Sequence, residues 1–248
     1  MRDRATLYAI QWAGLVAQIE LFGIHGPGSA LIEDHDMVGS VIPSVESSLI
    51  NSVISRDPTA PARGLPALRH HFTDAGAPKW GVWTAGDDER GAAAARDAGL
   101  VLDSTPAAMV APLDGVPDAE AEPVDLRTVG EINDAAYDFG VPKLAAPLAS
   151  LPDTVLPYAV RAADGAIGAV ALAFDHGHED TTVWFVATRP DAQRQGLGHQ
   201  VMAALLHDAR RRGNRTASLQ SSSKGRGLYE SLGFVAVGAV HLYEERLA

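Results

Sequence analysis

The chain has 248 residues, and 20 Lys and Arg against 31 Asp and Glu give it a formal net charge of −11 at pH 7. Apolar residues make up 46% of it and charged residues 21%, which excludes wholesale disorder, and the length suits one or two domains. The acidic balance argues against a general nucleic-acid binder, because such proteins are basic overall. The absence of cysteine excludes disulfides, thiolate catalysis and Cys-ligated zinc, and fits a reducing cytoplasm.

Residues 5–24 are apolar enough to resemble a signal peptide or a membrane-spanning segment. Gln11 and Gln18 interrupt the run, and Asp3 lies among the flanking arginines, where a signal peptide would be purely positive. The large apolar side chains recur at helical spacing and form a single stripe. We therefore predict an amphipathic helix that ends near Gly23, in a soluble cytoplasmic protein.

The remainder of the first half predicts short strands mixed with helices. Helices are expected at residues 65–75 and 87–99, where Asp87 would cap the second helix and Gly99 would end it. Short apolar runs predict strands at residues 30–32, 37–42, 48–54, 80–83 and 109–113. Residues 114–123 are rich in Pro, Gly and acids and lack periodicity, so they are interpreted as a linker. The predicted domains are an N-terminal α/β lobe at 1–118 and a second domain at 119–248.

The second half predicts an α/β or α+β domain on a mixed sheet. Asp164-Gly165 is a strong hairpin signal between two of its strands. Strands are expected at residues 158–163, 167–174, 181–188, 217–220 and 234–244. Helices are expected at residues 129–139, 144–151, 196–212 and 226–232.

The most informative segment is the loop that carries Gly196 and Gly198, between a predicted strand and a helix. Free backbone N–H groups and the helix dipole make a helix N-terminus an anion site, and glycines let the backbone approach a phosphate closely. Many strand–helix turns contain two glycines for structural reasons alone. Residues 194–226 hold seven basic residues and one acid, a local charge of 7 − 1 = +6. This window suits a ligand with several phosphates, although Arg210–Arg212 would also be favourable simply as cations at a helix C-terminus.

Two motifs in this half resemble those of the GNAT N-acetyltransferases. Gln193-Arg-Gln-Gly-Leu-Gly198 is similar to the family's (Arg/Gln)-x-x-Gly-x-(Gly/Ala) signature. Leu228-Tyr-Glu-Ser-Leu-Gly-Phe234 is similar to its Leu-Tyr-x-x-x-Gly-Phe segment. The resemblance covers roughly residues 123–248 and implies a mixed, mostly antiparallel sheet flanked by helices. The N-terminal lobe would then be a degenerate copy of the fold without a coenzyme A (CoA) site, because it lacks the signature loop.

The resemblance also implies a donor, acetyl-CoA, and a set of residues that hold it. The pyrophosphate would lie on the backbone amides of the signature loop, and the pantetheine arm would pair with the preceding strand. The implied cofactor-binding residues are Phe185, Val186, Ala187, Thr188, Gln193, Arg194, Gln195, Gly196, Leu197, Gly198, His199 and Ser222. The backbone N–H of Val186 would polarise the thioester carbonyl.

Tyr229 occupies the family position for the acid that protonates the departing thiolate, and the alternative is a core tyrosine that anchors the short helix. The sequence does not identify the general base, for which Asp138 is the first candidate. Asp34-His35-Asp36 and the His176-Gly-His178 segment are interpreted as solvated turn residues, so no metal is expected. A Rossmann dinucleotide site is disfavoured, because the third glycine of its fingerprint is replaced by Val201.

The leading hypothesis is direct transfer of acetyl from acetyl-CoA to a primary amine of a small molecule, in a ternary complex. One alternative is a non-catalytic acyl-CoA-binding or regulatory module of the same fold. Another is an aminoacyl-tRNA-dependent transferase of related fold, which the acidic balance disfavours. Neither nucleic acid nor membrane is expected as a partner, and the sequence leaves open whether the protein forms a homodimer.

Overall fold

The computed structural model describes residues 2–137 and 142–246, and the chain forms two compact units. The first comprises Met1–Ala108 together with Ala236–Ala248, and the second comprises Met109–Val235. The units are therefore bounded differently from the predicted division at 118/119. The end of the chain returns to the N-terminal unit, whereas the sequence prediction assigns it to the second domain.

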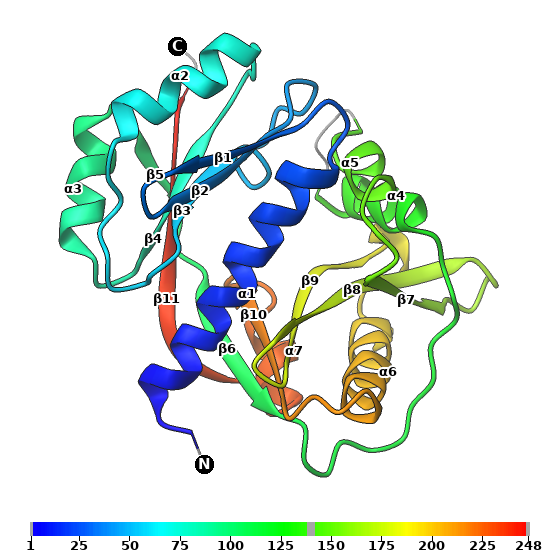
Figure 1. The fold of residues 1–248 in the computed structure, drawn as a ribbon. Coiled ribbons are helices and arrows are strands. Elements are labelled where there is room, and N and C mark those ends of the chain that lie inside the picture. The colour runs from blue at the N-terminus through cyan, green and yellow to red at the C-terminus, as the bar shows by residue number, and fades with distance from the viewer. Residues whose placement is uncertain (1, 138–141, 247–248) are drawn as a thin grey trace. The chain divides into compact units, whose positions relative to one another are not determined.

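The first unit is a sheet flanked by helices (Figure 1). Its helices are α1 (Arg4–His25), α2 (Leu65–Ala75) and α3 (Glu89–Asp97). Its strands are β1 (Ala30–Asp34), β2 (Met37–Val41), β3 (Ser52–Ser55), β4 (Gly81–Ala85), β5 (Val101–Ser104) and β11 (Val235–Glu244). The strand order is β1-β2-β3-β4-β11, with β5 also paired to β11, and only the β3–β4 pair is parallel.

Helix α1 packs on β1, β2 and β3. Asp3 caps it by accepting a hydrogen bond from the Thr6 backbone N–H at 2.7 Å, and buried Trp12 donates its ring N–H to the Ser55 carbonyl at 2.8 Å. By length and composition the helix could cross a membrane, but 61% of its most apolar window is buried in the structure. The expected helix is thus present, but buried residues cover most of its circumference, so it is a core helix rather than an amphipathic helix with a single apolar stripe.

Two details of this unit differ from the sequence prediction. The N-cap of α3 is Asp88 rather than Asp87, because the Asp88 carboxylate accepts the Gly91 backbone N–H at 2.9 Å. Strand β5 was not expected. Its residues are largely exposed, so it lacks the apolar alternation that marks a half-buried strand, and it is held by its pairing with β11.

The second unit is also a mixed α/β structure. Its strands are β6 (Ala107–Pro112), β7 (Val155–Arg161), β8 (Ile167–Gly177), β9 (Asp180–Thr188) and β10 (Thr216–Ser221). Its helices are α4 (Leu126–Tyr137), α5 (Ala145–Ala149), the 3-10 helix η1 (Pro190–Ala192), α6 (Leu197–Arg211) and α7 (Arg226–Ser231). The strand order is β6-β10-β9-β8-β7, where β7–β8 and β8–β9 are antiparallel and β9–β10 is parallel. The expected class, a mostly antiparallel mixed sheet flanked by helices, is confirmed.

Helices α4 and α5 are held together by one glycine and one carboxylate. A Cβ added at Gly130 would lie 2.4 Å from the Cα of Ala145, so the two helices cross too closely for any side chain there. The Asp134 carboxylate accepts the backbone N–H groups of Lys143, Leu144 and Ala145 at 3.0–3.3 Å. It therefore satisfies free donors at the start of α5.

A buried hydrogen-bond network joins the beginnings of β9 and β10. The Asp180 side chain is fully buried and accepts hydrogen bonds from Thr216 Oγ1 at 2.5 Å and Ser218 Oγ at 2.6 Å. His176 Nε2 lies 3.0 Å from the same carboxylate. The parallel strands are thus tied firmly at this end.

Candidate functional site

Strands β9 and β10 separate at their carboxyl ends. Their register runs from Asp180 opposite Thr216 to Val183 opposite Leu219 and then stops. Strand β9 continues to Thr188 and β10 to Ser221 without partners on each other. The four β9 residues predicted to contact the donor, 185–188, all lie on this separated part. Backbone groups along the edge of such an opening can pair with an extended ligand.

The separated part of β9 contains a β-bulge. In the pairing with β8, Leu172 lies opposite Trp184 and Val170 opposite Ala187, so Phe185 and Val186 face a single residue. Phe185 has a φ of 48°, which is unusual for a residue other than glycine. Asn133 of α4 donates its side-chain N–H to the Phe185 carbonyl at 3.0 Å. The bulge is the feature that turns the Val186 peptide out of the regular ladder.

The signature loop forms a cradle of free backbone N–H groups. Arg194 and Gly196 have φ values of 63° and 79°, and Gly196 is the N-cap of the 15-residue helix α6. Within the described residues, the backbone N–H groups of 193–199 donate no hydrogen bond to the protein. Successive free N–H groups in this kind of turn bind anions, and the helix dipole adds to the attraction. The loop therefore fits a phosphate group.

The cradle lies close to the end of β9 and to α7. The position of a Cβ on Gly198 would be 3.4 Å from Thr188 Oγ1 and 3.4 Å from Leu228 Cδ2. Ser222 lies just after β10, and its Oγ accepts the Gly225 backbone N–H at 3.3 Å. The predicted phosphate loop and pantetheine strand are therefore adjacent, and α7 lies beside the loop.

Tyr229 lies on α7 and is 9% exposed. Its ring packs edge-on against Phe234 with centroids 5.8 Å apart, and a Cβ on Gly225 would approach it to 2.9 Å. Its hydroxyl makes no hydrogen bond to another described residue. Burial, with a smaller contribution from Tyr137, raises the pKa of Tyr229 far above its ordinary value. The phenol therefore stays protonated at neutral pH, as a proton donor must.

Three of the seven basic residues that were expected to form a patch beside the phosphate loop lie elsewhere. Arg210 and Arg211 lie at the C-terminal end of α6, about 20 Å along the helix from the loop. Arg212 forms a two-pronged ion pair with Asp175 and a further ion pair with Asp208. The charge of the sequence window adds residues that a helix separates in space, and it leaves out Asp175, which lies on β8 and pairs with Arg212. Arg194 lies on the loop itself, and Lys224 and Arg226 lie at the start of α7.

Helix α4 supplies a residue that the sequence prediction missed. Asn133 holds the bulge of β9 from this helix. A signal for it exists in the sequence, because Asn133 is a polar residue on the helix face that carries buried Val129. Asp138, the candidate base, comes next after the helix in the sequence and lies outside the described residues.

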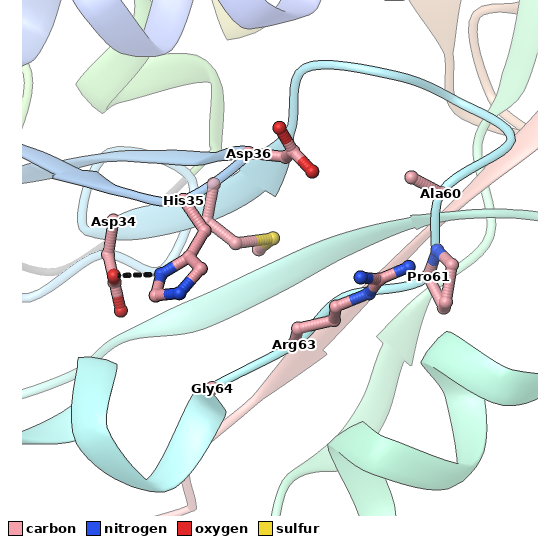
Figure 2. Close-up of a pocket in the computed structure, with 8 residues that line it drawn as sticks. Asp34, His35, Asp36, Ala60, Pro61, Arg63 and Gly64 are labelled. Carbon is pink, nitrogen blue, oxygen red and sulfur yellow. Dashed lines mark hydrogen bonds and ion pairs between the residues drawn. The ribbon is translucent and has the colours of Figure 1, made fainter.

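A separate surface pocket of about 230 Å³ lies in the first unit, between the β1–β2 hairpin and the start of α2 (Figure 2). Its lining residues are Asp34, His35, Asp36, Met37, Ala60, Pro61, Arg63 and Gly64. His35 Nδ1 lies 2.5 Å from Asp34 Oδ1, on a ring that is largely exposed. Nowhere in the described part of the chain do three or more His, Asp or Glu side chains gather as a metal site would require. The pocket shares no residue with the cradle.

One family model matches the part of the chain that contains the cradle. Residues 156–236 match the family model described as acetyltransferase (GNAT) domain. No curated protein sequence matches the chain.

Solved structures resemble the chain over nearly its whole length. A GCN5-related N-acetyltransferase from Kribbella flavida is 18% identical, with 96% of each chain covered and a TM-score of 0.66. An acetyltransferase of the GNAT family from Novosphingobium aromaticivorans is 18% identical, with 94% of this chain and 95% of that chain covered and a TM-score of 0.59. A third, from Sphaerobacter thermophilus, is 16% identical, with 98% and 93% covered and a TM-score of 0.57. At these identities the likeness establishes a shared fold.

Proposed function

Because residues 156–236 carry a GNAT acetyltransferase domain, we propose that the protein is an acetyl-CoA-dependent N-acetyltransferase acting on a primary amine of a small molecule. The observation that carries the proposal is the cradle of free N–H groups at 193–199, next to the separated end of β9. A phosphate-bearing ligand with an extended arm matches both features. Acetyl-CoA has this chemistry, and its thioester supplies an activated acetyl group.

The backbone at 193–199 would hold the pyrophosphate of the donor, with the Arg194 and His199 side chains at its edge. Residues 185–188 of β9 would pair with the pantetheine arm, and Ser222 would contact the donor from the loop after β10. These assignments place the thioester at the β9 bulge. They follow from the order of the groups along the donor, which runs from pyrophosphate to pantetheine to thioester.

The reaction needs two charge-stabilising contributions from the protein. As the amine nitrogen attacks the acetyl carbon, negative charge grows on the carbonyl oxygen, and the Val186 N–H would stabilise it. As the carbon–sulfur bond breaks, the Tyr229 hydroxyl would give its proton to the thiolate, and the proton that the attacking nitrogen loses on forming the amide would restore the phenol. The amine must lose a proton before it attacks, and Asp138 remains the proposed group to assist it. Because the chain has no cysteine to hold an acyl group, direct transfer in a ternary complex is favoured.

The acceptor and the setting of the enzyme are proposed from charge and composition. A net charge of −11 favours a cationic amine over an anionic one. The lack of cysteine fits the cytoplasm. Measurement of the mass in solution tests whether the protein forms a homodimer.

The test combines binding and turnover. Acetyl-CoA at about one hundred times its Kd should stabilise the folded state by about 2.7 kcal/mol, which appears as a higher melting temperature. Released CoA is then measured with a thiol-reactive chromophore against a panel of amines, and the cysteine-free protein contributes no thiol background. Tyr229→Phe should keep the affinity for acetyl-CoA and lower kcat by about 100-fold.

Each outcome supports one interpretation. Absence of any melting shift or heat of binding with acetyl-CoA would refute the proposal. Binding without turnover of any amine, and without an effect of Tyr229→Phe, would support a non-catalytic acyl-CoA-binding module instead. Turnover that requires charged tRNA would support a tRNA-dependent transferase.

A further inference from the structure

We infer that Asn133 is a positioning residue: its side-chain amide holds the peptide between Phe185 and Val186 and thereby sets the direction of the Val186 N–H. Asn133 lies on α4, more than fifty positions before the bulge in sequence, and it is fully buried. The inference rests on the proposed function, because it concerns the donor that would face the thioester carbonyl. It adds a residue that neither signature motif contains.

The hydrogen bonds define which way the amide points. Asn133 Nδ2 donates to the Val129 carbonyl at 2.9 Å and to the Phe185 carbonyl at 3.0 Å. Both partners are carbonyl oxygens and can only accept, so the NH₂ group must face them. One of these bonds stays within α4, and the other crosses to β9. The second bond is the one that acts on the bulge.

Peptide geometry carries the effect from the carbonyl to the next N–H. In a planar trans peptide, the C=O of Phe185 and the N–H of Val186 point in opposite directions. The Phe185 carbonyl points toward α4, so the Val186 N–H points away from α4. A hydrogen bond to the carbonyl also polarises the peptide and makes its N–H a stronger donor.

The bulge needs such support, because its backbone is strained. Phe185 has a φ of 48°, a region that side-chain-bearing residues avoid unless their surroundings impose it. Rotation about the N–Cα bond of Phe185 would relieve the strain, and it would also move the peptide that follows and turn the Val186 N–H to a different direction. The hydrogen bond from Asn133 opposes that rotation, so removing it should free the peptide.

The buried amide of Asn133 lowers the stability of the fold in a way that an apolar side chain in a purely structural role would not. Among the described residues, Asn133 Oδ1 is buried and has no hydrogen-bond partner. An unpaired buried oxygen destabilises the fold, whereas an apolar side chain of similar size would pack there without that penalty. The benefit that offsets this cost is the hydrogen bond that the NH₂ group donates to the Phe185 carbonyl.

The experiment compares Asn133→Leu with wild type on the full chain. The probe is a ¹³C-labelled ketone analogue of acetyl-CoA, which has a methylene between sulfur and carbonyl and cannot transfer its acyl group. In wild type the bound carbonyl resonance should move downfield from its free position, because the Val186 N–H polarises it. In Asn133→Leu we expect that movement to shrink by at least about half, kcat to fall about 10- to 100-fold, and the KM for acetyl-CoA to stay within about twofold.

A matched control separates an effect on the direction of the Val186 N–H from an effect on the stability of the fold. Asn51 in the first unit is also fully buried, and its amide bonds the Val45 carbonyl and the Ile42 N–H. Asn51→Leu removes a comparable buried amide, so it should lower the melting temperature and leave the ¹³C position unchanged. If Asn133→Leu fails to fold, Asn133→Ala is judged by the same criteria.

The possible failures are distinguishable. If wild type binds and turns over acetyl-CoA while the Asn133 variants keep the full carbonyl shift and the wild-type kcat, the inference is wrong and the proposed function stands. A loss confined to KM would likewise overturn it, because a mere packing role would produce that. If wild type itself binds no acetyl-CoA or analogue, the proposed function fails and the inference fails with it.

Discussion

Gly196→Ala tests the cradle with the smallest possible change. Gly196 has a φ of 79°, and a Cβ placed on it would meet no atom within 4 Å. In the ligand-free protein the methyl group therefore causes no collision, and its effect on stability comes from the left-handed backbone. For a residue with a Cβ this conformation costs about 1–2 kcal/mol. The variant changes the backbone preference of the loop without changing its charge.

The cost must appear either in stability or in affinity. If the free variant keeps the loop as it is, the folded state loses about 1–2 kcal/mol, which lowers the melting temperature by about 2–8 °C. If the loop of the free variant instead adopts an unstrained conformation, the stability is retained. Binding of acetyl-CoA must then restore the left-handed conformation at position 196. The affinity for acetyl-CoA then falls about 5- to 30-fold. The two losses should together equal the strain.

Gly213→Ala supplies the matched control on the same helix. Gly213 follows the C-terminus of α6 with a φ of 99° and equally open surroundings. Its alanine variant should lose stability alone, with an unchanged Kd for acetyl-CoA by titration calorimetry. The reasoning is refuted if Gly196→Ala changes neither quantity, or if both variants weaken binding to the same extent.

Three further predictions concern the fold and its pH dependence. Gly130→Ala should destabilise the protein by about 1–3 kcal/mol in urea unfolding, because the new methyl group would have to displace the backbone at Ala145. Lys79→Met should cost about 1–3 kcal/mol at pH 7, because it leaves the buried Glu244 carboxylate without the ammonium 2.7 Å away. Burial alone would raise the pKa of Glu244, but hydrogen bonds from Lys79 and a serine hydroxyl lower it overall. The wild type therefore gains stability above the unfolded pKa and loses it on acidification. The difference in unfolding free energy between variant and wild type should narrow toward pH 4, and a constant difference would contradict this account. Burial raises the pKa of Tyr229 in the folded state, so absorbance at 295 nm should show this phenol still neutral above pH 10. The stability of the fold should fall as the pH rises above that value. Ionisation of every tyrosine near pH 10 without unfolding would contradict this prediction.

The sequence predicts local features of the site well. The glycines at 196 and 198 and the helix that follows them are fixed by neighbouring residues, so the turn could be predicted from a short stretch of chain. The same holds for Tyr229, whose motif spans one helix and the residues after it. In each case the interactions that define the structure lie within about two helical turns.

Features that depend on distant residues could not be predicted in this way. The bulge at Phe185 arises from a register shift against β8 and a hydrogen bond from Asn133, and neither is visible in a single strand. Arg212 contributes to the basic charge of its sequence window, but it pairs with Asp175 on β8, which is 37 positions away in the sequence. Strand β5 has no apolar alternation and is held by pairing with the end of the chain.

The return of β11 to the first unit has a consequence for how the protein is made. Val240–Glu244 pair with β4, and the same strand pairs with β5, so the N-terminal unit receives two of its pairings from residues that follow the whole second unit in the sequence. During synthesis β4 and β5 must wait with open edges while the second unit is produced. The two units are therefore not separable genetic modules, since cutting the gene after residue 118 would deprive the N-terminal product of its closing strand.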